Sequence, residues 1–340
     1  MSRAVPLRRC VPALLAIFAL AACGNDDITE PVIPVEGTLT VDGSAGWGYA
    51  SLASEQPVTV ADPYSSTAWD IGFNATNVML NGGAVGPGGV SAYCICQNDG
   101  ATNEQILAMT PESEQADFDA VTAVPAGAQF EDERLLPAIT GWFTGAGAAA
   151  QPATDKVWLV RLSEETSFAK VRVTGVSGAT ATGFGSVTLE YALQPSAAEA
   201  FGPTQTVTLG GAASSVDLNT GSTAPSGNSW DLRLDGTVLR LNGGVSGTGK
   251  AAATAATAAF ADVATAAVDA RAYQSDLFGG VFRTHPWYKY NLTGDNRITP
   301  TFQVYLLKRG DAVYKVQVLN YYGPAGELRR ITFRYAQLAD

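Results

Sequence analysis

The chain contains a single histidine, His285, in the segment Thr284-His285-Pro286-Trp287-Tyr288. Imidazole is the usual side chain for proton relays near neutral pH and a common metal ligand, so this position could support either chemistry. One imidazole in 340 residues argues against most hydrolases and most zinc enzymes. The plain alternative is that His285 is a partly exposed loop residue that precedes a proline.

A second candidate for chemistry is the pair Cys94 and Cys96, which are separated by one residue. A bridge over so short a spacing needs an unusual turn, so a local disulfide, two free thiols and an intermolecular link all remain open. The local disulfide is the first interpretation. A metal site would need further soft ligands, and one histidine that is distant in the sequence is too few.

Two further patterns indicate turns and not catalysis. The segment Gly244-Val245-Ser246-Gly247-Thr248-Gly249-Lys250-Ala251 approaches a phosphate-binding loop, but Ala251 stands where a hydroxyl would hold magnesium. We therefore expect no nucleotide. Carboxylate pairs such as Glu164-Glu165 lie in turn-like segments, where solvated charge is the usual role. The sequence predicts no catalytic residues and a protein that is not an enzyme.

Composition and charge limit the partners. The chain has 21 Lys and Arg against 32 Asp and Glu, and the resulting charge of −11 repels phosphate backbones, so no nucleic acid is expected. With 46% hydrophobic and 16% charged residues, the composition excludes a disordered chain, a collagen and a coiled coil.

The N-terminal segment is typical of an exported lipoprotein. Residues 1–22 combine three arginines with a short apolar run and predict a signal peptide. The run ends in Leu20-Ala21-Ala22-Cys23-Gly24, so we expect Cys23 to be acylated after cleavage and to anchor the protein in a membrane. Residues 23–36 would form a spacer. Gly24 favours the outer membrane, with the periplasmic and surface faces both open.

The elements that must position these residues occur twice. Trp69-Asp70 and Leu80-Asn81-Gly82-Gly83 reappear 161 residues later as Trp230-Asp231 and Leu241-Asn242-Gly243-Gly244. Matches in the same order continue to the C-terminus, and they predict two tandem domains, 37–194 and 200–340. The first carries an insertion at about 90–110. We interpret the Trp-Asp and Asn-Gly-Gly residues as scaffold.

Both ranges are rich in period-two alternation, which predicts antiparallel strands. It is clear at residues 156–162, 302–307, 314–319 and 330–335. We also expect about one short helix in each domain, at Pro111–Val124 and in the Ala-rich stretch Lys250–Ala270, for which a disordered spacer is the alternative. The expected fold class is mainly β.

Several ordered motifs carry a resemblance to a known family. They are Trp230-Asp231, Leu241-Asn242-Gly243-Gly244, Ser246-Gly247-Thr248-Gly249, Trp287-Tyr288-Lys289-Tyr290, Tyr314 to Tyr322 and Ile331-Thr332-Phe333-Arg334-Tyr335. This pattern resembles the HmuY-like family of bacterial lipoproteins, with 200–340 the closer copy and 37–194 a diverged one. The resemblance implies two β-rich domains of a periplasmic or surface lipoprotein. Its best-known members capture haem for iron acquisition and pass it to an outer-membrane receptor.

The resemblance also implies a haem site near His285, with the imidazole on the iron and Trp287, Tyr288 and Tyr290 packing against the porphyrin. Family members use two histidines or two methionines as axial ligands, and this chain has no second histidine. Met79 and Met109 lie in the first range only. The second ligand would have to be a tyrosine such as Tyr273, come from the other copy, or be absent. The alternative is a structural or interaction lipoprotein that has lost haem binding.

Overall fold

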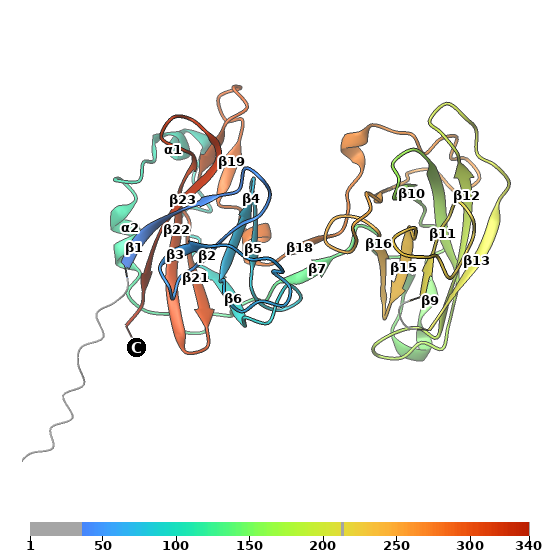
Figure 1. Cartoon of the computed structure of the whole chain (residues 1–340), viewed down its shortest axis with the longest axis horizontal. Helices are drawn as coiled ribbons and strands as arrows, with labels where there is room; N and C mark the ends of the chain where they lie inside the picture. The colour runs from blue at the N-terminus through green and yellow to red at the C-terminus, as the bar shows by residue number, and fades with distance from the viewer. Residues whose placement is uncertain (1–35, 212–213, 340) are drawn as a thin grey trace, which may run out of the picture. The chain divides into compact units, whose positions relative to one another are not determined.

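The computed structural model describes residues 36–211 and 214–339 (Figure 1). The expected signal peptide 1–22, the expected lipidation site Cys23 and nearly all of the spacer 23–36 lie outside this range. None of the helices in the described residues combines the length and the apolar character that a membrane span requires.

The fold is mainly β, with antiparallel sheets and short helices, as the alternation predicts. The α-helices of the described residues are α1 (Asn103–Ala108), α2 (Gln115–Ala120) and α3 (Val281–Thr284). Helix α2 lies inside the range where a helix is expected. The prediction of a helix at Lys250–Ala270 is wrong, because that stretch begins with strand β17 (Ala252–Ala255) and continues as turns. Pairing of β17 with β10 (Trp158–Arg161) buries Ala252 and Ala253, and this packing overrides the helix propensity of alanine.

Two five-stranded antiparallel sheets carry most of the structure. The order in the first is β1 (Glu36–Asp42), β23 (Leu328–Gln337), β22 (Ala312–Tyr322), β21 (Val304–Arg309) and β6 (Val90–Cys94). The order in the second is β13 (Gln205–Gly210), β12 (Ser186–Gln194), β11 (Phe168–Ser177), β10 and β17. Each sheet therefore joins strands from the beginning of one expected domain to strands from the end of the other.

Smaller sheets complete the fold. A four-stranded sheet has the order β3 (Gln56–Val58), β2 (Gly48–Ser51), β4 (Ile71–Asn74) and β5 (Asn77–Leu80). A three-stranded sheet has the order β14 (Ser214–Val216), β15 (Leu232–Asp235) and β16 (Val238–Leu241). Three two-stranded sheets pair β7 (Arg134–Leu136) with β18 (Leu277–Gly279), β8 (Phe143–Thr144) with β9 (Gln151–Pro152), and β19 (Tyr288–Tyr290) with β20 (Ile298–Pro300).

These pairings divide the described chain into two sheet-rich regions, each with its own core. The Trp69 region comprises residues 36–133 and 280–339, and the Trp230 region comprises 137–276, with β7 and β18 as the paired connection between them. The boundaries of the sheets therefore differ from the expected domain boundaries 37–194 and 200–340. A period-two pattern identifies a strand and its buried face but not the strand with which it pairs.

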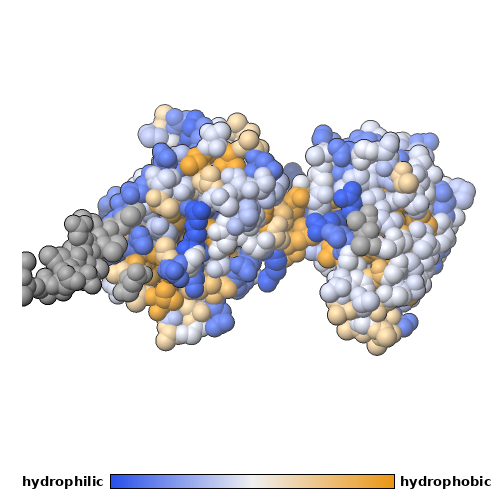
Figure 2. Space-filling view, turned by 60° about the horizontal axis from the view of Figure 1, so that its bottom comes forward, coloured by the Kyte–Doolittle hydropathy of each residue, from blue (hydrophilic) through white to orange (hydrophobic). Residues whose placement is uncertain are grey.

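The hydrophobic cores follow the two regions. Ile71, Phe73, Tyr305 and Phe333 belong to the core of the Trp69 region. Trp158, Val171, Leu189 and Leu232 belong to that of the Trp230 region. On the face shown in Figure 2, hydrophobic residues form separate patches among hydrophilic and intermediate ones.

The repeated motif makes the same hydrogen bonds in both regions. Asn81 is fully buried, and its Nδ2 donates to the carbonyl of Trp69 at 2.8 Å while its Oδ1 accepts from the Gly88 N–H at 3.0 Å. Asn242 makes the equivalent bonds: its Nδ2 donates to the carbonyl of Trp230 at 2.8 Å, and its Oδ1 accepts from the Gly249 N–H at 3.0 Å. These residues fix local backbone geometry in each region, which supports their interpretation as scaffold.

Candidate functional site

His285 ends helix α3 in the Trp69 region. Its backbone N–H donates to the carbonyl of Val281 at 2.8 Å, and its carbonyl accepts a hydrogen bond from Tyr305 Oη at 2.7 Å. The Tyr305 ring stacks on Phe282 of α3 with a centroid separation of 4.1 Å. The histidine backbone is therefore held by a buried tyrosine of β21, and its ring is left partly exposed.

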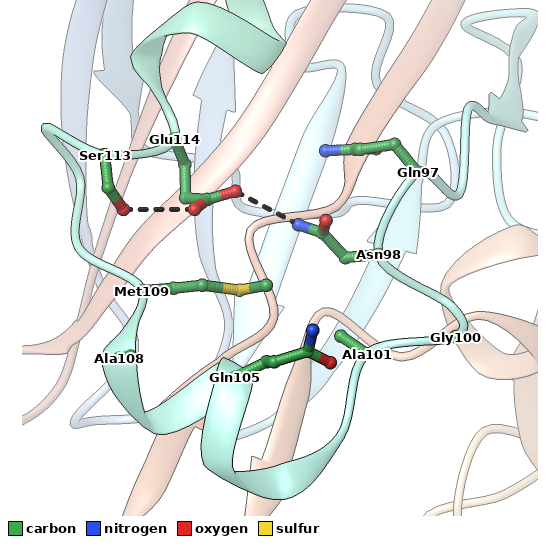
Figure 3. Close-up of a pocket in the computed structure, with 9 residues that line it drawn as sticks. All are labelled: Gln97, Asn98, Gly100, Ala101, Gln105, Ala108, Met109, Ser113 and Glu114. Atoms are coloured by element: carbon green, nitrogen blue, oxygen red, sulfur yellow. Dashed lines mark hydrogen bonds between the residues drawn. The ribbon is translucent and has the colours of Figure 1, made fainter.

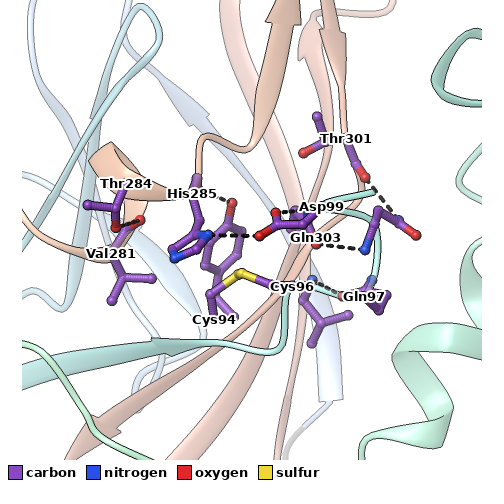
Figure 4. The surroundings of a disulfide bond; sticks show 12 residues. Cys94, Cys96, Gln97, Asp99, Val281, Thr284, His285, Thr301 and Gln303 are labelled. Atoms are coloured by element: carbon purple, nitrogen blue, oxygen red, sulfur yellow. Dashed lines mark hydrogen bonds and ion pairs between the residues drawn. A yellow bond between two sulfur atoms is a disulfide. The ribbon is translucent and has the colours of Figure 1, made fainter. Parts of the chain in front are cut away.

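The imidazole of His285 has an acidic partner. Its Nδ1 lies 3.1 Å from Oδ2 of Asp99, in the segment that follows β6 (Figure 4). The other oxygen of Asp99 accepts a hydrogen bond from Gln303 Nε2 at 2.8 Å. Because both carboxylate oxygens are engaged, Asp99 holds the histidine ring in a defined orientation.

Cys94 and Cys96 form a disulfide beside this pair, with a Cα–Cα distance of 5.1 Å. Cys96 has a φ of 57°, in the left-handed region, and this conformation turns its side chain back toward Cys94 at the end of β6. One donor atom from each of Cys94, Cys96 and His285 lies within 4.8 Å of the others. The fold thus brings together three side chains that include one from a distant part of the sequence.

The aromatic residues expected around a haem do not surround a common cavity. Trp287 is 1% exposed, and its Nε1 donates to the carbonyl of Thr76 at 3.1 Å, so it belongs to the core. Tyr288 packs on Trp287 with a centroid distance of 5.3 Å and lines a pocket of only about 160 Å³. Tyr290 is 57% exposed, and its hydroxyl donates to Asn296.

Tyr273, the tyrosine considered as a second iron ligand, belongs to a different cluster in the Trp230 region. It packs near Phe168, and its hydroxyl donates to the carbonyl of Ala266. Burial raises the pKa of Tyr273 to about 12, which disfavours the phenolate that would bind iron. Of the five residues expected at a haem, Trp287 and Tyr273 are therefore buried in hydrophobic clusters, whereas His285 and Tyr290 are at least partly exposed.

A pocket of about 470 Å³ lies in the same region, within the segment of the expected insertion (Figure 3). Helix α1 forms one wall and is started by a capping box between Thr102 and Gln105. Met109 ends this helix, and its side chain extends between those of Gln105 and Glu114. The pocket is largely open to solvent, and its lining is mainly polar.

The opposite wall is held by hydrogen bonds to Glu114, which is 9% exposed. Its carboxylate accepts from Asn98 Nδ2 at 3.3 Å and from Ser113 Oγ at 3.0 Å. Asn98 also donates to the carbonyl of Thr301 at 3.0 Å, which attaches this segment to the connection between β20 and β21. The remaining lining is Gln97, Gly100, Ala101 and Ala108, so the pocket presents amides, one carboxylate and one thioether, without Lys or Arg.

Neither the pocket nor the role of Asp99 is evident from the sequence. The one available signal was the insertion itself, since a long loop that one copy has and the other lacks is often functional. Of the methionines in the described residues, Met79 is buried in a hydrophobic cluster, whereas Met109 lines the pocket.

Comparison with known proteins gives a family match to part of the chain. Residues 44–139 match the family model described as HmuY protein. These residues lie in the first expected domain, although the motifs of the second suggested the closer resemblance. No curated protein matches the chain.

Two solved structures are similar to the chain at low identity. One is the apo HmuY analog of Tannerella forsythia, with 10% identity, 93% of this chain and 100% of that chain covered, and a TM-score of 0.36. The other is a Bacteroides fragilis protein described as a lipoprotein, with 12% identity, 88% and 90% of the two chains covered, and a TM-score of 0.32.

Proposed function

We propose that this chain is an exported, lipid-anchored binding protein, not an enzyme, and that its ligand site is the pocket beside Met109. The export signal at 1–22 and the lipidation motif at Cys23 support the anchor. The match of residues 44–139 to the model described as HmuY protein supports a binding role, since the best-known members of the family that the sequence resembles capture haem. The observation that carries the site is the placement of Met109 in a pocket of about 470 Å³.

The family match makes a haem-type tetrapyrrole the first ligand of this proposal. A thioether can ligate haem iron, and Met109 is the methionine of the described residues that a ligand can reach. The amides of Gln97, Asn98 and Gln105 would supply hydrogen bonds at the edge of the pocket. Because the lining has no cation to pair with carboxylates, we expect modest affinity. An outer-membrane receptor is the partner that the resemblance implies.

A second candidate is an interaction lipoprotein of the outer membrane that binds no haem. One specific observation favours it: the aromatic residues expected to contact a porphyrin are used elsewhere, Trp287 in the core and Tyr273 in the Trp230 region. In this case the sheets would serve as contact surfaces for another macromolecule.

Titration of haemin into purified residues 24–340 distinguishes these functions. The fragment retains every residue that the structure describes, and Met109→Leu removes the sulfur with little change in volume. We expect a Soret shift that Met109→Leu weakens and His285→Ala leaves in place. A shift that His285→Ala abolishes would contradict the Met109 site. No shift in either iron state would favour the interaction lipoprotein.

A further inference from the structure

We propose that reduction of the Cys94–Cys96 disulfide creates a binding site for Zn²⁺, made of the two thiolates and the imidazole of His285. This site is separate from the Met109 pocket and does not depend on the proposed haem-type ligand. The disulfide and the metal are alternative occupants of the same sulfur atoms, so the redox state of the pair decides whether the cation binds.

The donor atoms are already close to the required geometry. Zinc bonds of about 2.3 Å to sulfur and about 2.0–2.1 Å to nitrogen place tetrahedral ligand atoms about 3.5–3.8 Å apart. The donor atoms of Cys94, Cys96 and His285 lie within 4.8 Å of one another. Cleavage of the S–S bond lets the sulfurs separate, and rotation of the three side chains supplies the rest of the adjustment.

Tyr305 positions both halves of the site. In the antiparallel pairing of β6 and β21, Tyr305 is the partner of Cys94. Its hydroxyl also donates to the carbonyl of His285 at 2.7 Å, and its side chain is fully buried. One core residue therefore fixes the distance between the cysteine pair and the histidine, although these lie far apart in the sequence.

Asp99 acts as a positioning residue for the imidazole. When Nδ1–H of His285 donates to the Asp99 carboxylate, 3.1 Å away, the lone pair that a cation can take is the one on Nε2. Such carboxylate–histidine pairs are the common support of zinc-binding histidines, and they raise the basicity of the ligand nitrogen. Gln303 holds the second Asp99 oxygen and prevents the carboxylate from rotating away.

The chemistry balances without a redox change of the metal. An external dithiol supplies two electrons and two protons, the S–S bond breaks, two thiols form, and the dithiol becomes a disulfide. Binding of Zn²⁺ then releases the two thiol protons to water. Two thiolates and one imidazole match the preference of zinc, and the fourth position stays open for water or another ligand.

Zinc binding to reduced and oxidised residues 24–340 tests the proposal. This fragment has no cysteine other than Cys94 and Cys96, so reduction yields two titratable thiols per chain. After reduction with a phosphine that is then removed under nitrogen, we expect one ZnCl₂ equivalent to bind in competition with a chromogenic chelator. CoCl₂ in its place should give thiolate-to-cobalt charge-transfer bands. The oxidised protein should show neither signal.

Variants assign the ligands. We expect the double substitution Cys94→Ser and Cys96→Ser to abolish the cobalt bands. We expect His285→Ala to weaken zinc binding at least about tenfold, and Asp99→Asn to weaken zinc binding about 10- to 100-fold. Asp117→Asn, on an exposed part of α2, is the matched control and should leave the affinity unchanged. Circular dichroism of each variant checks that it folds.

Two outcomes would overturn the proposal. One is equal zinc affinity for the oxidised and the reduced protein, which would place the cation elsewhere. The other is a folded, reduced protein that gives no thiolate-to-cobalt bands. Neither outcome bears on the Met109 pocket, whose haemin titration is run on the oxidised protein.

Discussion

Lys315 on β22 donates from Nζ to the carbonyl of Phe118 at 2.8 Å, and its ammonium lies 4.4 Å from the centre of the Phe118 ring. Lys170 on β11 makes the same two contacts with Phe260: its Nζ lies 2.8 Å from the Phe260 carbonyl oxygen and 4.8 Å from the centre of the Phe260 ring. In each pair the lysine and the phenylalanine come from different expected domains. We propose that 37–194 and 200–340 descend from one duplicated unit and have exchanged strands, so that each region contains parts of both copies.

Strand exchange predicts the behaviour of a cut chain. A protease site introduced between Pro195 and Pro203, an exposed connection, would divide the chain after β12. We expect the two fragments to stay together in size-exclusion chromatography and to separate only in denaturant, because each five-stranded sheet contains strands from both fragments. Fragments that elute separately and melt independently would contradict the proposal.

Glu133 predicts a pH dependence of stability. It is 2% exposed, its carboxylate oxygens make no hydrogen bond within the described residues, and burial raises its pKa from 4.5 to about 7. The folded state therefore holds the proton more tightly than the unfolded state. The stability that comes from burying the protonated Glu133 is fully present below pH 4.5 and is lost as the pH rises toward 7. We expect the free energy of unfolding to fall by about 3 kcal/mol over this interval.

Urea unfolding at several pH values measures this change. Glu133→Gln keeps the shape and removes the ionisation, so the stability difference between the wild type and this variant should shift by that amount across the interval. A difference that stays constant between pH 4.5 and 7.5 would show that Glu133 is not desolvated.

The buried amides of the repeated motif predict matched losses of stability. Asn81→Ala and Asn242→Ala each remove hydrogen bonds to two carbonyls and one N–H, and leave the buried carbonyl of Trp69 or Trp230 without this partner. We expect each to lower the free energy of unfolding by about 2–4 kcal/mol. Asn103→Ala, at an exposed position, should change it by less than about 0.5 kcal/mol. A strong effect at only one of the two buried positions would count against equivalent scaffold roles.

The glycines of the same motif predict a steric effect. A Cβ at Gly82 would lie 2.0 Å from the carbonyl oxygen of Val90, and one at Gly243 would lie 2.1 Å from that of Ala251. We expect Gly82→Ala and Gly243→Ala each to destabilise the protein by more than about 2 kcal/mol, since the clash is with backbone. Gly100→Ala meets no atom within 4 Å and should be tolerated. Thermal melting of the three variants makes the comparison.

The sequence by itself determined the local features of this protein. Period-two alternation marked the strands of the mainly β fold, and the repeated Asn-Gly-Gly positions marked turns that both regions contain. The expected export signal is local as well, because a peptidase reads a short contiguous segment. Local patterns failed at Lys250–Ala270, where sheet pairing outweighed helix propensity.

Only the tertiary structure decided which residues meet. His285 and Asp99 are 186 residues apart, and they come together because β6 pairs with β21, a choice that alternation does not specify. The same pairing brings His285 to the cysteine pair. Hydrophobic periodicity determines which face of a strand is buried, whereas the partner of that strand depends on the packing of the whole core, to which distant segments contribute equally.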